Sequence, residues 1–430
     1  MLNPRIAKTA GHRAWGQLAL TCGLLLSASA CKSTFNDIIA VDPADRVAEG
    51  VLFNNPNQAA LLTGSVQAQF ECAYGAYALT LGLLAGELNS LGATQFFSVD
   101  ARRPDKAGGF NGQYATNDCS GGIGVYVPLS SARWFADKVL AALQGWTDTE
   151  VSGRNALIAS AAAYSGYSYL LLGEGFCSMA VDAGTEQTPA QMFALAEAKF
   201  GVAIAAAQSA GASGVEALNT ALVGRARARL NLANTTGALA DAQAVPAAFV
   251  KNATRTLGNV LRENQIYNFV NRSVALGLGP AYYDVRFNGK ADPRVPAVFV
   301  GQTTTNVARY TQTKYNSEGA SIPIATGAEA RLIMAEIQGG QAAVDIINAL
   351  HTAVGLDQFA GTDPTAIRNQ VIEERRRQFF LDGHRNYDRI RYSLPLDPAV
   401  GAPYRWGGLH GDAKCLPLPD IERLNNPNMN

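Results

Sequence analysis

Carboxylates and guanidinium groups gather near the C-terminus, and together they have the residue types for acid–base chemistry. Glu373 and Glu374 are followed directly by three arginines, residues 375–377. Carboxylates beside arginines have shifted pKa values both in active sites and in structural ion pairs. Glu373 and Arg377 are four residues apart, the spacing at which such a pair supports a helix. We therefore expect a structural ion-pair network that connects adjacent helices through Glu373, Arg376, Arg377, Asp382, Arg385 and Asp388.

Thiol chemistry is the next candidate. Apart from Cys31, the chain after residue 30 contains four cysteines, Cys72, Cys119, Cys177 and Cys415. They include no Cys-x-x-Cys pair, which argues against zinc. An even number in an exported chain predicts one or two disulfides, and four cysteines allow three pairings that the sequence does not distinguish.

Histidine gives no sign of a metal site. His351, His384 and His410 each stand apart from other potential ligands. We therefore expect surface or structural histidines, no metal and no cofactor.

The first thirty residues are typical of an export signal. Three basic residues precede an uncharged apolar run over residues 18–30, which is short for a membrane-spanning helix. Small residues at positions 28–30 stand directly before Cys31, as in a bacterial lipobox, where the thiol is acylated and becomes the new N-terminus. We expect a lipoprotein signal peptide at residues 1–30 and lipidation of Cys31. Ordinary cleavage that leaves a free Cys31 thiol is the alternative.

Composition excludes several classes of protein. The 430 residues include 35 Lys and Arg against 35 Asp and Glu, without the basic excess of a nucleic-acid-binding protein. Loss of the signal removes three basic residues and no acidic one, which leaves 32 against 35. Hydrophobic residues make up 48%, enough to exclude a mainly disordered chain. Beyond the signal we expect no stretch with enough uninterrupted apolar residues for a membrane helix, so the expected link to the membrane is the lipid anchor.

Helical spacing of apolar residues dominates the first half of the chain. It predicts helices over residues 131–145, 155–173, 217–231 and 236–244, and one that begins at Pro189. Small residues recur where neighbouring helices would cross closely, as in tetratricopeptide units. The irregular period predicts stacked helical hairpins without a uniform solenoid.

The second half begins differently. Residues 249–324 are rich in Asn, Thr, Gly, Val and aromatics, which predicts short strands and long loops. Helices are expected again over residues 328–338 and 341–354. Asp363 then caps a helix with Pro364 at its first position, which runs to near Gly383, and a short helix follows over residues 386–392.

Four segments resemble the SusD/RagB family of outer-membrane nutrient-binding lipoproteins. Residues 371–392 (VIEERRRQFFLDGHRNYDRIRY) look like the family's acidic-basic helix pair. Residues 314–315 and then 322–336 (IPIATGAEARLIMAE) are similar to its strand-to-helix segment, and residues 416–428 (LPLPDIERLNNPN) resemble its closing segment. The lipobox followed by Val-Asp-Pro at residues 41–43 fits its mature start. Together the four lie in register over nearly the whole mature chain.

The resemblance implies a mostly α fold, in which tetratricopeptide-like helical hairpins support an irregular, loop-rich, ligand-facing lobe. It implies one SusD-like domain over residues 31–430, with a helical-hairpin part over 31–248 and a RagB/SusD part over 249–430. It also implies no catalysis. Such a protein lies at the outer membrane, faces the cell exterior, and works with a SusC-like TonB-dependent transporter to take up oligosaccharide or, in some members, peptide.

A sugar ligand would need aromatic side chains, because sugar rings present an apolar C–H face that stacks on them. Useful aromatics should lie on loops, where core packing does not bury them. The candidates are Phe96, Phe97, Tyr282, Tyr283 and Trp406. Each of them has a core-packing role as its alternative.

Two other functions fit parts of the sequence. A helical-repeat scaffold lipoprotein would bind only protein partners. A glycoside hydrolase would need two carboxyl groups on opposite sides of the sugar bond, and no local arrangement in the chain marks such a pair.

Overall fold

The computed structural model describes residues 52–109 and 112–429. The signal peptide and Cys31 lie outside the described residues, so lipidation stays a prediction. Asn55–Asn430 forms one compact unit. The following paragraphs concern this unit.

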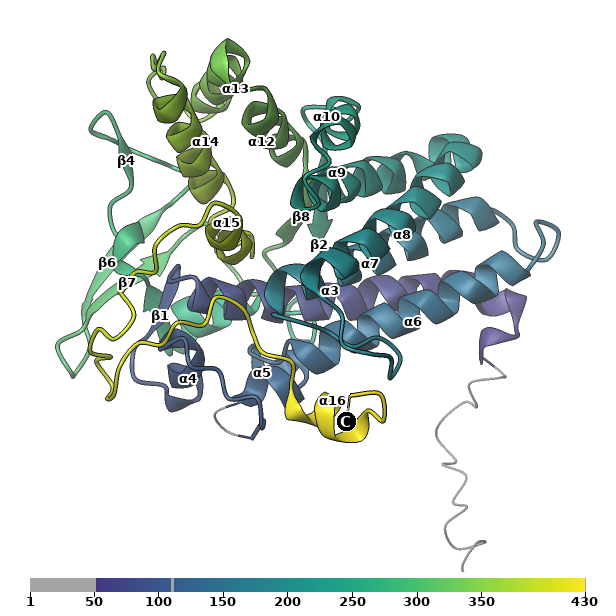
Figure 1. Cartoon of the computed structure of the whole chain (residues 1–430), viewed down its shortest axis with the longest axis horizontal. Helices are drawn as coiled ribbons and strands as arrows, with labels where there is room; N and C mark the ends of the chain where they lie inside the picture. Colours follow the sequence, from purple (N-terminus) through teal and green to yellow (C-terminus); the bar gives the residue numbers. More distant parts are fainter. Residues whose placement is uncertain (1–51, 110–111, 430) are drawn as a thin grey trace, which may run out of the picture. The chain divides into compact units, whose positions relative to one another are not determined.

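Five long helices pack in series to form a helical scaffold (Figure 1). They are α3 (Ala59–Leu84), α6 (Tyr126–Gly145), α7 (Arg154–Gly175), α8 (Pro189–Ala210) and α9 (Val215–Asn231). Helix α6 contacts both α3 and α7, α7 contacts α8, and α8 contacts α9. The expected helical-hairpin architecture is confirmed. Helix α8 begins with a capping box, in which the Thr188 hydroxyl and the Gln191 side chain each accept a hydrogen bond from the other's backbone N–H.

Helix α3 was not expected from the sequence. Every residue from Phe70 to Leu84 is buried, and α3 contacts α6, α7 and α15. A helix that is buried on all sides has no polar face, and therefore no apolar stripe for a period-based reading to detect.

A second group of helices follows the irregular region and comprises α12 (Gly327–Gln338), α13 (Gly340–Ala353), α14 (Pro364–Gln378), α15 (Arg385–Arg391) and the short α16 (Asp420–Asn425). Four other helices lie elsewhere in the chain. The short helices α4 (Phe97–Asp100) and α5 (Gln113–Thr116) lie between α3 and α6, α10 (Thr235–Gln243) follows α9, and α11 (Gln265–Tyr267) belongs to the irregular region. Asp363 caps α14 by accepting from the Ala366 N–H. Helix α14 ends earlier than expected, because Leu381 and Gly383 have φ values of 60° and 82°, which a helix does not tolerate.

The strands of the described chain form four two-stranded antiparallel sheets. The pairs are β1 (Leu88–Ser90) with β3 (Leu276–Leu278), β2 (Val250–Ala253) with β8 (Ile322–Thr326), β4 (Arg286–Phe287) with β5 (Lys290–Ala291), and β6 (Ala297–Gln302) with β7 (Ala308–Gln312). Such short strands joined by long loops agree with the irregular lobe expected over residues 249–324.

The structure selects one of the three cysteine pairings. Cys72 of α3 pairs with Cys119, and Cys177 pairs with Cys415, with Cα–Cα distances of 5.8 Å and 5.2 Å. Both distances lie in the usual range for a disulfide. The second bond joins the segment after α7 to residues 392–429, which we call the C-terminal segment.

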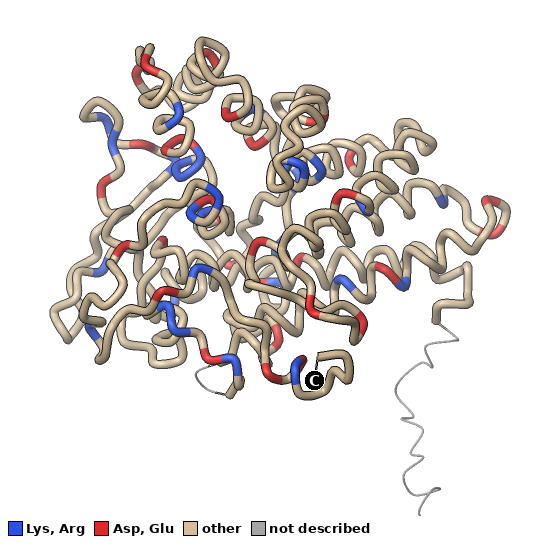
Figure 2. The backbone as a smooth tube through the Cα atoms, in the orientation of Figure 1, with Lys and Arg blue, Asp and Glu red and all other residues tan. Residues whose placement is uncertain are grey.

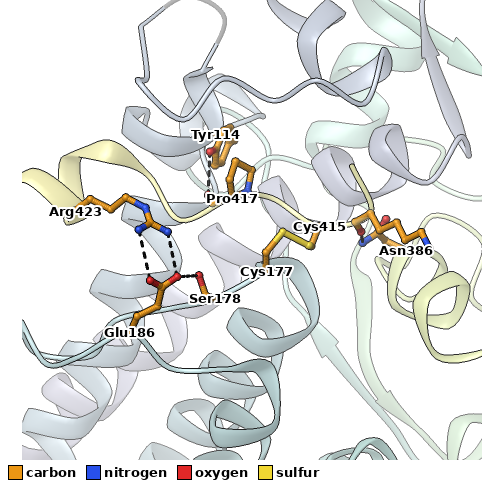
Figure 3. The surroundings of a disulfide bond; sticks show 9 residues. Tyr114, Cys177, Ser178, Glu186, Asn386, Cys415, Pro417 and Arg423 are labelled. Atoms are coloured by element: carbon orange, nitrogen blue, oxygen red, sulfur yellow. Dashed lines mark hydrogen bonds and ion pairs between the residues drawn. A yellow bond between two sulfur atoms is a disulfide. The ribbon is translucent and has the colours of Figure 1, made fainter. Parts of the chain in front are cut away.

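Hydrogen bonds hold the C-terminal segment on both sides of Cys415 (Figure 3). Asn386 donates to the Lys414 carbonyl at 2.8 Å, and the Tyr114 hydroxyl donates to the Pro417 carbonyl at 3.0 Å. Further on, Arg423 of α16 pairs with Glu186 at 3.1 Å. The path of this segment is therefore fixed where it crosses the scaffold.

Acidic and basic residues are interspersed and do not separate onto opposite sides in this view (Figure 2). By length and composition alone, two helical stretches are apolar enough to cross a membrane, Arg154–Gly175 and Pro189–Asn231. In the first, 83% of the apolar window is buried inside the fold. The expectation that no such stretch follows the signal was therefore wrong, because core helices carry as few charges as membrane helices do.

Candidate functional site

In each of the two expected aromatic pairs, residues 96–97 and 282–283, the first ring is buried in the core and the second is partly exposed. Phe96 is fully buried and packs edge-on against Phe269, with ring centroids 5.2 Å apart. Tyr282 is 2% exposed and stacks on Phe380 at 5.1 Å. The prediction that Phe96 stacks on ligand is therefore wrong, because its ring offers no free face. Tyr282 packs in the core and only borders a pocket described below.

Phe97, Tyr404 and Trp406 form a cluster that we call the aromatic shelf. Phe97 begins α4, whereas Tyr404 and Trp406 belong to the C-terminal segment. The Phe97 and Trp406 rings are parallel to within 4°, with centroids 5.6 Å apart, and Tyr404 packs edge-on against Phe97 at 5.8 Å. The Trp406 Nε1–H donates to the Ser90 carbonyl at 3.1 Å, which fixes the indole. Phe97 and Trp406 are half-buried, so each keeps some accessible ring surface.

Tyr283 belongs to a second aromatic group, together with Phe299 and Tyr310. Phe299 of β6 and Tyr310 of β7 are direct cross-strand partners, with ring centroids 5.2 Å apart. Tyr310 in turn stacks on Tyr283 at 3.8 Å, and Phe299 is 54% exposed. Phe299 and Tyr310 were not singled out in the sequence. The sequence signal that could have identified them is the aromatic-rich strand pattern of the irregular region.

A pocket of about 340 Å³ lies beside the aromatic shelf. Its walls come from the C-terminal end of α3, from β1, from residues 279–282, from α15 and from the C-terminal segment. Tyr404 of the shelf lines it directly, and Ser90, which holds Trp406, lines it as well. Its charged and titratable lining residues are Asp100, Arg102, Arg376, Arg385, Arg389, Asp397, Arg405 and His410.

Asp100 connects the pocket to the shelf. Its Oδ2 accepts from the Tyr404 hydroxyl at 2.8 Å and from the Ser90 N–H at 2.9 Å. Burial raises the pKa of Asp100 to about 6, and these two hydrogen bonds oppose the rise. The pKa of His410 is lowered by burial and then by the charge of Arg102, so this imidazole is neutral at pH 7.

The charged residues expected to form a network lie around α14. Within the helix, Arg376 pairs with Glu373 at 2.7 Å. Arg377 contacts Glu373 more loosely at 3.8 Å and also reaches Asp292 at 3.3 Å. The Arg376 guanidinium lies over the Tyr282 ring, 5.2 Å from its centroid. These contacts connect α14 to the irregular lobe.

The remaining carboxylates of this set are also paired. Asp388 of α15 accepts from Arg375 of α14 at 2.8 Å, and Asp382 accepts from Lys314 at 2.7 Å. Burial raises the pKa of Asp388, but the charges of Arg375 and then Arg391 outweigh it and lower the pKa to about 2. Arg385 departs from the expectation. It forms no ion pair with any described residue and lines the pocket.

The part of the chain that the structure describes contains no candidate metal site. No group of three His, Cys, Asp or Glu residues there is arranged to hold a metal ion. The three histidines in the described part of the chain are buried. The His351 Nδ1–H donates to the Asp357 carbonyl at 2.6 Å, and its Nε2 forms a hydrogen bond with Glu374 at 2.8 Å, which makes His351 structural.

Comparison with known proteins rests on the fold. No family model matches the chain, and no curated protein matches its sequence. Solved structures do match. A SusD superfamily protein from Bacteroides fragilis aligns over 88% of this chain and 100% of its own, with 13% identity and a TM-score of 0.65. The chain has the SusD fold.

Two other structures support this assignment. A SusD-like carbohydrate binding protein from Bacteroides vulgatus covers 87% of this chain and 97% of its own, with 13% identity and a TM-score of 0.64. A SusD homolog from Bacteroides thetaiotaomicron covers 88% of this chain and 96% of its own, with 15% identity and a TM-score of 0.62. At these identities the likeness is one of fold, and the SusD fold expected from the sequence is confirmed.

Proposed function

We propose that this protein is an outer-membrane lipoprotein of the SusD/RagB type, which captures oligosaccharide at the cell exterior and delivers it to a SusC-like TonB-dependent transporter without breaking bonds. The observation that carries the proposal is the aromatic shelf beside a polar pocket. Aromatic faces with nearby hydrogen-bonding groups are what sugar recognition requires. Two solved structures with this fold are named a SusD-like carbohydrate binding protein and a SusD homolog.

The cysteines support an extracytoplasmic location. Disulfides persist in oxidising compartments and are rare in the cytosol, and this chain forms two. The export signal and the lipobox at Cys31 point the same way. Acylation of Cys31 would tether the folded unit to the membrane through buried acyl chains.

Capture would begin at Trp406 and Phe97. The Trp406 indole is fixed by the Ser90 carbonyl, and the Tyr404 hydroxyl is fixed by Asp100, so little side-chain entropy is lost when a sugar ring stacks there. A ring on the shelf would extend toward the pocket that Tyr404 lines. Tyr283 and Tyr310 of the second aromatic group offer a further contact for a longer oligomer.

A hydrolytic role has one observation in its favour, the raised pKa of Asp100 in the pocket. Glycoside hydrolysis would need Asp100 to donate a proton to the glycosidic oxygen. However, its Oδ2 already accepts two hydrogen bonds, which favour the ionised form and bind it to the shelf. We therefore assign Asp100 a positioning role. Release of reducing ends from a glycan panel by the purified protein would overturn this assignment.

Isothermal titration calorimetry against oligosaccharides tests the proposal. Trp406→Ala should weaken the affinity for a bound oligosaccharide at least tenfold, or about 1.4 kcal/mol. Trp134→Ala is the matched control, since Trp134 is 37% exposed on α6 and lies outside the shelf. Peptides form a second arm. If no sugar or peptide binds while a membrane protein co-purifies, the protein is a scaffold for protein partners.

Delivery is tested separately in the source membrane. Affinity purification of the full-length protein should recover a TonB-dependent transporter, and Cys31→Ser should remove the protein from the membrane fraction. Recovery of the transporter with no effect of Trp406→Ala on sugar uptake would contradict a role for the shelf in capture.

A further inference from the structure

The pocket beside the aromatic shelf contains an excess of positive charge. Arg102, Arg385, Arg389 and Arg405 all line it, and none of them forms an ion pair with a carboxylate among the described residues. A fifth arginine of the lining, Arg376, is already neutralised by Glu373. Two lining carboxylates, Asp100 and Asp397, offset part of this charge.

Arg389 is one of two buried cations in this set, together with Arg102. It is 6% exposed on α15, and its Nη1 donates to the Leu84 carbonyl at 3.2 Å. Its Nη2 is buried and has no hydrogen-bond partner. A buried guanidinium with an unpaired N–H is costly, so such groups are normally paired. Because Arg389 also lines the pocket, we expect a ligand bound there to supply the missing acceptor.

Two neighbours of Arg389 are incompletely bonded in the same way. The Nη1 of Arg385 and the Nδ1 of His410 are also buried without a partner, and both residues line the pocket. Arg102 differs, because it donates to the backbone carbonyls of Gly411, at 3.1 Å, and Pro398. Carbonyl bonds satisfy its N–H groups but leave its charge without a counter-ion.

The electrostatics agree with this arrangement. Burial, followed by the charges of Arg102 and Arg385, lowers the pKa of Arg389 to about 10. It remains charged at neutral pH, but in a field that disfavours a cation. A bound anion would reverse that effect, because opposite charge favours the protonated guanidinium.

The pocket is too large for a simple ion and only partly polar. Its volume of about 340 Å³ falls in the range of sites for small organic molecules, roughly 300–1,000 Å³. Leu83, Leu84, Leu88 and Pro280 also line it and provide apolar surface beside the charged groups. A ligand that fits this mixed lining has an apolar C–H surface and an anionic group on the same unit.

We propose that the pocket binds the carboxylate of an acidic sugar, a uronic acid unit of an oligosaccharide whose neighbouring ring stacks on the aromatic shelf. This inference rests on the proposed function and narrows its substrate class. Arginine presents a planar fork of donors that matches a carboxylate. The apolar part of the lining favours a carboxylate carried on a sugar ring over inorganic phosphate, which has no apolar surface to bury.

Calorimetry on the mature full-length chain tests this with five probes: trigalacturonate, its methyl ester, maltotriose, inorganic phosphate and trialanine. Trigalacturonate should bind at least tenfold tighter than the ester, and its affinity should fall as salt is raised. Arg389→Gln should remove that preference while leaving binding of the ester within threefold. Arg389→Lys, which keeps the charge but loses the fork, should retain part of the preference.

Arg255→Gln is the matched control. Arg255 is equally buried at 6% exposure, has an unpartnered Nη2, and has a pKa lowered by burial to about 10, but it does not line this pocket. It should leave the preference for the acid unchanged. If Arg389→Gln fails to fold, Arg405→Gln substitutes for it, since Arg405 is exposed at the pocket rim and should weaken acid binding at least threefold.

The outcomes separate the two proposals. Equal affinity for acid and ester, or an unchanged preference in Arg389→Gln, overturns the acidic-sugar assignment but leaves oligosaccharide capture intact. Binding of phosphate alone, or of trialanine in preference to trigalacturonate, overturns the assignment and also argues against a sugar as the captured nutrient.

Discussion

Phe200 is clamped between two glycines of the helices that flank it. It is fully buried on α8, with Gly166 of α7 and Gly224 of α9 against its ring. A Cβ at Gly224 would lie 2.3 Å from Phe200 Cζ, and one at Gly166 would lie 2.7 Å from Cδ1. Both separations are far below van der Waals contact. The spacing of α7, α8 and α9 therefore depends on the absence of two side chains.

Gly224→Ala should destabilise the fold. Overpacking of a well-packed core costs about 1–3 kcal/mol, whereas replacing a helical glycine by alanine gains about 1 kcal/mol. Because the clash is severe, we expect a net loss of about 1–2 kcal/mol. Gly201→Ala is the matched control on α8, since a Cβ there would meet nothing within 4 Å. It should gain about 0.5–1 kcal/mol from helix propensity alone.

Urea unfolding followed by circular dichroism measures both changes. The cause can be isolated with Phe200→Leu, because removing part of the ring should abolish most of the penalty of Gly224→Ala in the double variant. A stability of Gly224→Ala equal to or above that of Gly201→Ala would refute the clamp. A penalty that persists unchanged in the double variant would refute Phe200 as its origin.

Three other changes test the charged core and the disulfide. Burial raises the pKa of Glu87 to about 7, above its value in the unfolded chain. The free energy of unfolding should therefore fall by about 3 kcal/mol as the pH rises from 4.5 past 7. In urea unfolding, Glu87→Gln should be more stable than wild type at pH 8 but differ little from it at pH 5. Asp388→Asn leaves Arg375 unpaired and should lower the free energy of unfolding by about 3–5 kcal/mol. Between pH 4 and 2 the variant should lose less stability than wild type does, because the depressed pKa of Asp388 contributes stability that is lost on acidification. Replacing Cys177 and Cys415 by Ser should lower the free energy of unfolding by about 2–5 kcal/mol. It should also speed amide hydrogen exchange around the aromatic shelf. Unchanged exchange there would contradict the idea that the disulfide helps to position the shelf.

The sequence predicted the amphipathic helices but not the central one. Helices such as α8 have a capping box and one apolar stripe, and both signals are local. Helix α3 is buried from Phe70 to Leu84, so its pattern is uniform and its helical nature follows only from its neighbours. The same uniformity makes α7 resemble a membrane helix in composition.

The site was predictable only in part, because its residues meet through long-range contacts. Trp406 was identified from its type and its glycine-rich surroundings, but which member of the pairs 96–97 and 282–283 faces the core depends on tertiary packing. Arg389 gave no signal, since an arginine in the last turn of a short helix is usually a solvated residue. Its burial against the end of α3 becomes visible only when residues some 300 positions apart are brought together, as in its hydrogen bond to Leu84.

The bond between Cys177 and Cys415 closes a covalent loop, since the two cysteines are 238 positions apart. All of the irregular lobe and most of the second helical group lie inside that loop. A protease that nicks an exposed turn anywhere within it therefore cannot release either fragment, and the two pieces would separate on a gel only after reduction. The protein would in this way survive a single cut as one particle, with its C-terminal segment still attached to the helical scaffold.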